Sequence, residues 1–166
     1  PKVGASRSSD ALLEPEMLAH ALAVISAEIF GEPVDADRAV TLALFHDATE
    51  VLTGDLPTPI KYHSAEISKA YKQVEQLACD KLLNTLPDEI RASFAPFVGG
   101  EAEDRLYDIV KAADKLSAYI KCIEERRAGN DEFLSAEKQI RQILAYCCKF
   151  QKGLQQLFIA YPVSAC

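Results

Sequence analysis

The sequence predicts an all-α bundle, and two observations support this fold class. Apolar residues recur at spacings of three and four, which places them on one side of a helix, over most of the chain. Alternating runs of β-branched residues, which are typical of strands, are missing. With 166 residues and 49% apolar side chains, the chain fits one compact domain. We expect that domain over residues 14–166, after a mobile N-terminal arm over residues 1–13.

The first half of the domain has clear helix signals. Apolar positions at helical spacing predict a first helix over residues 16–30. A second helix is predicted over residues 35–52, with Asp35 as its N-cap and Gly54 just beyond its end. Residues 55–60 contain two prolines and therefore predict an ordered loop.

The second half predicts four more helices. Ser64 opens a helix with one apolar stripe, and Pro87 occupies the first position of the next. A long helix is predicted over residues 102–127, and a last one over residues 131–157 with a break at Gly153. The stripe after Ser64 consists of Ile67, Tyr71, Val74, Leu77, Ala78 and Leu82.

Charge and composition exclude several classes of function. The net charge of −7 argues against binding to a nucleic-acid polymer, which requires clustered Lys and Arg. No apolar stretch approaches the ~20 residues of a membrane span, and the N-terminus lacks an apolar signal core. The five cysteines have no metal-binding spacing and are typical of reduced thiols. We therefore expect a cytoplasmic protein.

His46 and Asp47 are the strongest candidates for a functional site. They are adjacent in an apolar run that we expect to be buried, where unpaired charge is costly. Consecutive helical residues point about 100° apart, so both side chains can contact one metal ion. Asp114, in a later helix with apolar neighbours, is the candidate for a further ligand. The alternative for Asp114 is a solvated acid paired with a neighbouring lysine.

Glu50 and Asp55 are the candidate catalytic acids. Glu50 lies four residues after His46, so a continuous helix would place both on one face. Asp55 follows Gly54, where the backbone turns and a side chain can point back toward the helix end. One carboxylate can accept a proton from water while the other assists the departing oxygen. The alternative is that both are surface acids at a helix end.

The residues around this site resemble a known family. The strings LFHDATEVLTGDLPTPIKY (residues 44–62), VKAADKLSAYIK (residues 110–121) and EERRAGNDEFL (residues 124–134) resemble the HD-domain phosphohydrolases. Within them, the similarity is greatest to the bacterial 5′-deoxynucleotidases, which hydrolyse deoxyribonucleoside 5′-monophosphates. The resemblance covers roughly residues 17–135. A His-Asp pair alone is a weak signal, whereas the block from Glu50 to Pro59 is a strong one.

The resemblance implies an HD-domain helical bundle that acts as a metal-dependent phosphomonoesterase. His46, Asp47 and Asp114 would bind a divalent cation such as Co²⁺, Mn²⁺, Zn²⁺ or Mg²⁺, with Glu50 and Asp55 as catalytic residues. It also implies a nucleotide substrate and a homodimer. Two alternatives are an HD hydrolase of another phosphorylated metabolite and a catalytically impaired helical scaffold. The residues implied to line the phosphate pocket are Thr53, Pro57, Thr58 and Lys61.

One element of the family pattern is missing near the N-terminus. The resemblance implies a metal-binding His nine positions before His20, where this chain has Ala11. The family's upstream Arg-Trp pair has no counterpart either, and the chain contains no Trp. One explanation is that this chain has lost a metal ligand. The other is that the sequence near residues 10–16 joins two segments across missing residues. The start at Pro1, without an initiator Met, favours the second explanation. The second explanation predicts a break in the chain between Asp10 and Glu16.

Overall fold

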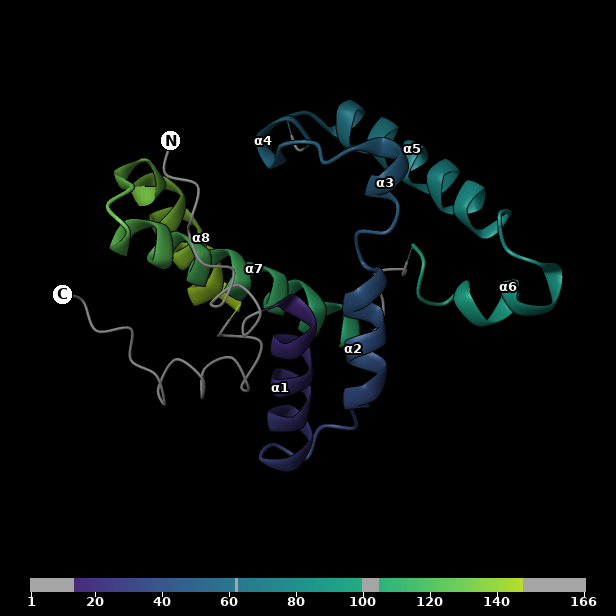
Figure 1. The fold of residues 1–166 in the computed structure, drawn as a ribbon, viewed down its shortest axis with the longest axis horizontal. Helices are drawn as coiled ribbons and strands as arrows, with labels where there is room; N and C mark the ends of the chain where they lie inside the picture. The colour runs from purple at the N-terminus through teal and green to yellow at the C-terminus, as the bar shows by residue number, and fades with distance from the viewer. Residues whose placement is uncertain (1–13, 62, 100–104, 148–166) are drawn as a thin grey trace, which may run out of the picture. The chain divides into compact units, whose positions relative to one another are not determined.

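Helices and turns make up all the regular structure of the computed structural model, which describes residues 14–61, 63–99 and 105–147 (Figure 1). Within these ranges the prediction of an all-α fold is confirmed. The predictions about the arm over residues 1–13, the chain break after Asp10 and the end of the last helix lie outside the described residues.

The chain divides into two compact units after residue 43 and before residue 104. The first, called here the α7 unit, contains α1 (Pro15–Glu28), most of α2 (Ala36–Phe45), α7 (Arg105–Arg127), the 3₁₀ turn η2 (Asp131–Phe133) and α8 (Leu134–Cys147). The second, called the α5 unit, contains α3 (Glu50–Thr53), α4 (Thr58–Lys61), α5 (Ala65–Leu83) and α6 (Asp88–Phe94). The single domain over residues 14–166 stays a prediction.

The core of the α7 unit is built on helix α7, which packs against α1 and α8 (Figure 1). Ala19, Leu22 and Ala23 of α1 are buried, as is Leu144 of α8. Apolar side chains of α7 at spacings of three and four share one face of the helix, and this face is buried. The buried side chains of α7 are Leu106, Ile109, Val110, Ala112, Ala113, Leu116, Tyr119 and Cys122.

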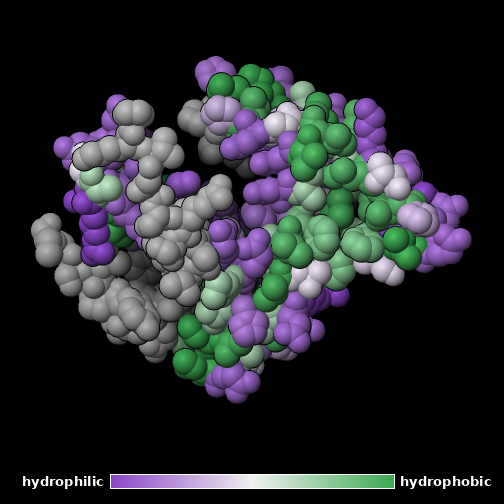
Figure 2. Space-filling model, in the orientation of Figure 1, coloured by the Kyte–Doolittle hydropathy of each residue, from purple (hydrophilic) through white to green (hydrophobic). Residues whose placement is uncertain are grey.

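The α5 unit is organised along its 19-residue helix. The Ser64 side chain accepts a hydrogen bond from the backbone N–H of Ile67 at 3.2 Å, which confirms the predicted N-cap. Short helices α3 and α4 both pack against α5 (Figure 1). The predicted apolar stripe is only partly covered, because Val74 and Leu77 are 47% and 66% exposed. Figure 2 shows hydrophobic side chains on the surface of this unit.

Two predicted elements differ from the structure. The helix predicted over residues 35–52 is interrupted by turns at residues 46–49, although no Gly or Pro marks the interruption. The loop predicted over residues 55–60 contains the start of the single-turn helix α4. Its Pro59 lies in the first turn, where a helix loses no internal hydrogen bond because the first N–H groups have no partner within it.

Candidate active site

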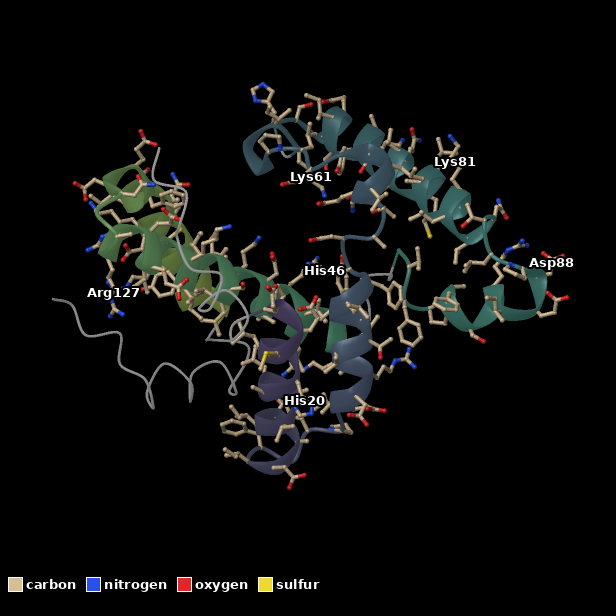
Figure 3. All side chains as sticks on the ribbon, in the orientation of Figure 1. His20, His46, Lys61, Lys81, Asp88 and Arg127 are labelled. Atoms are coloured by element: carbon tan, nitrogen blue, oxygen red, sulfur yellow. The ribbon has the colours of Figure 1, made fainter. Side chains whose placement is uncertain are left out.

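His46 and Asp47 lie in a turn that begins where α2 ends. The backbone N–H of Ala48 donates to the carbonyl of Phe45 at 3.0 Å, and that of Glu50 donates to Asp47 at 2.9 Å. These bonds span three residues, as in a 3₁₀ turn, and not the four of an α-helix. The placement of His46 and Asp47 within one continuous helix is therefore wrong, although the turn still brings their side chains together. His46 Nε2 lies 3.0 Å from Asp47 Oδ2. Figure 3 labels His46.

The two side chains differ in burial. The His46 side chain is 17% exposed, which agrees with the expectation of a sheltered imidazole. The Asp47 side chain is 56% exposed, and Val51 is 83% exposed, so the expectation that the whole segment is buried is wrong. Val51 lies after the turn and therefore no longer continues the buried face of α2.

Glu50 begins α3 and lies within the electrostatic influence of several charged side chains. Burial raises the pKa of Glu50 above its usual value, and the negative charges of Asp47 and Asp55 raise it further. The positive charge of Lys61 opposes these effects, as does the nearby imidazole of His46 to a smaller extent. Glu50 therefore holds a proton more readily than an ordinary glutamate, as a general base must do once it has accepted one.

The raised pKa of Glu50 predicts a pH-dependent cost to stability. In metal-free protein the folded state binds the Glu50 proton more tightly than the unfolded state, so this group lowers the free energy of unfolding as the pH rises above the ordinary value of 4.5. Glu50→Gln should therefore raise the melting temperature at pH 7. The gain should shrink as the pH falls toward 4.5, the usual pKa of this side chain, and should be absent below that value, where both the folded and the unfolded state bind the proton.

Glu66 is the matched control, because its pKa is shifted in the opposite direction. Hydrogen bonds from its own backbone N–H and from Ser64 lower the pKa of this exposed carboxyl. Glu66→Gln should therefore lower the melting temperature at pH 7 and lose its effect at acidic pH. Melting temperatures of both variants measured from pH 3 to 8 provide the test. Parallel curves for parent and Glu50→Gln would contradict the assignment.

The other predicted residues of the α5 unit lie along the segment after Glu50. Gly54, with φ of 69°, ends α3, and the exposed Asp55 follows it. The hydroxyl of Thr53 lies 3.0 Å from the carbonyl oxygen of Gly54. The carbonyl of Pro57 accepts a hydrogen bond from the N–H of Lys61 at 3.1 Å, and Thr58 is the first residue of α4. The segment therefore links the end of α3 directly to Lys61.

Asp114 lies on α7, in the other unit. Its side chain is 38% exposed and its Oδ2 lies 3.0 Å from Lys115 Nζ. The structure thus contains the lysine pairing that is the alternative to metal binding by Asp114. The neighbours of Asp114 along the chain, Ala112 and Ala113, are buried, as expected for a residue beside the core. The ligand role of Asp114 stays a prediction.

The donors of the α5 unit fit a divalent cation that accepts nitrogen and oxygen ligands. An imidazole and a carboxylate lie 3.0 Å apart at His46 and Asp47, and the nearby acids Glu50 and Asp55 add negative charge. A bound cation would relieve the repulsion that raises the pKa of Glu50. Among the described residues of this unit, no three His, Cys, Asp or Glu side chains form a metal-binding group. A metal ion bound by His46 and Asp47 therefore needs a further ligand from outside the described residues of the α5 unit.

Sequence reasoning missed two residues of α5 that contact the site segment. Glu75 Oε1 lies 2.6 Å from Lys61 Nζ, and the Tyr71 ring centroid lies 4.3 Å from the same nitrogen. Tyr71 had been assigned only to the apolar stripe. The spacing of four between Tyr71 and Glu75 indicates that they share a helix face, but it does not reveal that Lys61 is their partner.

The chain is similar over most of its length to one protein family and to several named relatives. A family model described as "5′-deoxynucleotidase YfbR-like" matches residues 10–161. A 5′-deoxynucleotidase of Citrobacter koseri is 48% identical over 138 residues, which cover 82% of this chain and 69% of the relative. The 5′-deoxynucleotidase YfbR of Shigella dysenteriae serotype 1 has the same identity and coverage. The 5′-deoxynucleotidase VV1113 of Vibrio vulnificus is 46% identical over 144 residues, 86% of this chain and 74% of the relative.

Proposed function

We propose, from the premise that this chain belongs to the YfbR-like family of 5′-deoxynucleotidases, that it hydrolyses deoxyribonucleoside 5′-monophosphates to deoxynucleoside and phosphate. Family membership makes the chain a hydrolase. The observation that carries the proposal for the site is the grouping of His46, Asp47, Glu50 and Asp55 within one segment, where their charges act on one another.

His46, Asp47 and Asp114 would hold a divalent cation. Such a cation supplies two things: it polarises the phosphate oxygens, and it lowers the pKa of the attacking water from about 15.7 toward ~7. The imidazole of His46 is sheltered and therefore well placed as a ligand, whereas the more exposed Asp47 is open to both cation and solvent. Co²⁺, Mn²⁺, Zn²⁺ and Mg²⁺ all accept nitrogen or oxygen donors of this kind.

Glu50 and Asp55 would divide the proton transfers between them. Glu50, whose pKa is raised, accepts the proton of the attacking water. Asp55 is exposed beyond the end of α3 and faces less neighbouring structure, which suits a group that orients or protonates the departing nucleoside oxygen. Thr53, Pro57, Thr58 and Lys61 would line the phosphate pocket, with Lys61 providing the positive charge.

The setting of the enzyme is part of the proposal. The thiols of Cys79 and Cys122 are free and buried, which supports a reducing cytoplasm and reduced cysteines. Burial also raises the pKa of both thiols, so they stay protonated. Among the described helices, none has both the length and the apolar character needed to cross a membrane. We propose that the enzyme works on small nucleotides as a homodimer.

A screen of phosphate release tests the function. The protein should release phosphate from deoxyribonucleoside 5′-monophosphates when one of the four divalent ions is supplied, and chelation should stop the reaction. Ribonucleoside monophosphates and sugar phosphates should be poorer substrates. A His46→Ala preparation, purified in parallel, controls for contaminating phosphatases. Equal hydrolysis of ribonucleotides would contradict the substrate, and a protein that binds metal but hydrolyses nothing would favour the scaffold alternative.

A further inference from the structure

Lys61 is held by two residues of α5. Its Nζ lies 2.6 Å from Glu75 Oε1, the distance of a charge-assisted hydrogen bond, and 4.3 Å from the centroid of the Tyr71 ring. The side chains of Lys61 and Glu75 are only 25% and 33% exposed, so water screens this pair less than a fully exposed one. These contacts restrict an otherwise flexible four-carbon side chain.

The two residues that hold Lys61 lie on one long helix. Tyr71 and Glu75 are one helical turn apart on α5, a 19-residue helix that Ser64 caps at its N-terminus. Lys61 ends the short helix α4, which packs on α5, and Figure 3 shows Lys61 in this part of the unit. A long capped helix can therefore fix the ammonium more precisely than the α3–α4 segment alone.

The position of Lys61 has an electrostatic consequence for the site. Its positive charge acts on Glu50, in the same segment as His46, Asp47 and Asp55. A dianionic phosphate entering a group of carboxylates meets repulsion, which a fixed cation offsets. Glu75 has a cost as well as a benefit, because its carboxylate partly neutralises Lys61. The benefit of Glu75 is that it holds the ammonium in place before the substrate arrives, so that less conformational entropy is lost when the phosphate binds. We expect this benefit to exceed the cost.

We propose that Glu75 and Tyr71 are positioning residues, which hold the ammonium of Lys61 so that it binds the phosphate group of the substrate. This inference rests on the proposed function, and it assigns to α5 a role in phosphate binding in addition to its structural one. Neither residue contacts the phosphate in this scheme. Both act only through Lys61.

A double-mutant cycle tests the inference. Lys61→Ala should raise KM for a deoxyribonucleoside 5′-monophosphate, and Kd for inorganic phosphate, about tenfold, with a smaller change in kcat. Glu75→Ala should raise both constants about threefold to tenfold. In the Lys61→Ala background, Glu75→Ala should have no further effect, because the residue through which it acts is gone. An equal effect of Glu75→Ala in both backgrounds, or none in the parent, would overturn the proposal.

Two further comparisons separate positioning from loss of stability. Arg126 and Glu137, in the α7 unit, form an ion pair whose carboxylate is more buried than that of Glu75, so Glu137→Ala should lower the melting temperature without raising KM. If Glu75→Ala fails to fold, Tyr71→Leu provides the same test: it should raise KM, and Tyr71→Phe, which keeps the ring, should raise it less. Equal KM values for these two variants would then count against the proposal. A parent protein without nucleotidase activity would contradict the proposed function, while the Kd for phosphate still tests the positioning.

Discussion

His46→Ala or Asp47→Ala is expected to abolish metal binding and phosphate release together, while the helical fold is retained. The imidazole and carboxylate lie 3.0 Å apart in the turn after α2, and loss of either removes one of two adjacent donors from a small ligand set. Without the cation, water stays a poor nucleophile at neutral pH. The fold should survive, because both residues lie in a turn outside the buried faces of α1 and α7.

Metal analysis, circular dichroism and phosphate-release assays on the same preparations check this result. His63→Ala is the matched control, since His63 is exposed at the start of α5 and belongs to no proposed ligand set. It should retain both metal and activity. Hydrolysis at the parent rate by either the His46 or the Asp47 variant would show that the metal site lies elsewhere.

Glu50→Ala is expected to retain the metal and to lose roughly 10²-fold or more in kcat, the usual contribution of a general acid or base. Its carboxyl has a raised pKa and lies among the charged groups of the site, but the proposed ligand set does not need it. The measurements are kcat with saturating metal and the metal content of the same sample. Glu89→Ala, which removes an exposed acid from the first turn of α6, should leave both unchanged. A Glu50 variant that has lost its metal would identify Glu50 as a ligand.

The sequence predicted the long helices well because their signals are local. The apolar spacing of α7 and the Ser64 cap of α5 depend on residues within a few positions of one another. The interruption at residues 46–49 could not be predicted in this way, because Asp and Thr are only mildly unfavourable in helices and no Gly or Pro occurs there. The positive φ of Gly54 marks only the end of the segment.

Contacts distant in sequence were beyond prediction from one chain. The Lys61–Glu75 pair joins residues 14 apart, and the Arg105–Glu32 pair joins residues 73 apart, at 2.6 and 2.8 Å. Helical periodicity reports which residues share a face of one element, and contains no information about which element packs against that face. His46, Asp47, Glu50 and Asp55 could be proposed from the sequence because all four lie in one continuous string, residues 44–62, whereas Tyr71 and Glu75 lie outside it. The roles of these residues stay predictions.

The ligand set proposed for one divalent ion consists of His46, Asp47 and Asp114. A crystal structure of the Co²⁺-loaded protein, with anomalous scattering recorded at the cobalt edge, measures this directly. We expect one anomalous peak within about 2.0–2.3 Å of a nitrogen of His46 and of carboxylate oxygens of Asp47 and Asp114. A peak bound by other side chains, or one that leaves Asp114 paired only with Lys115, would contradict it.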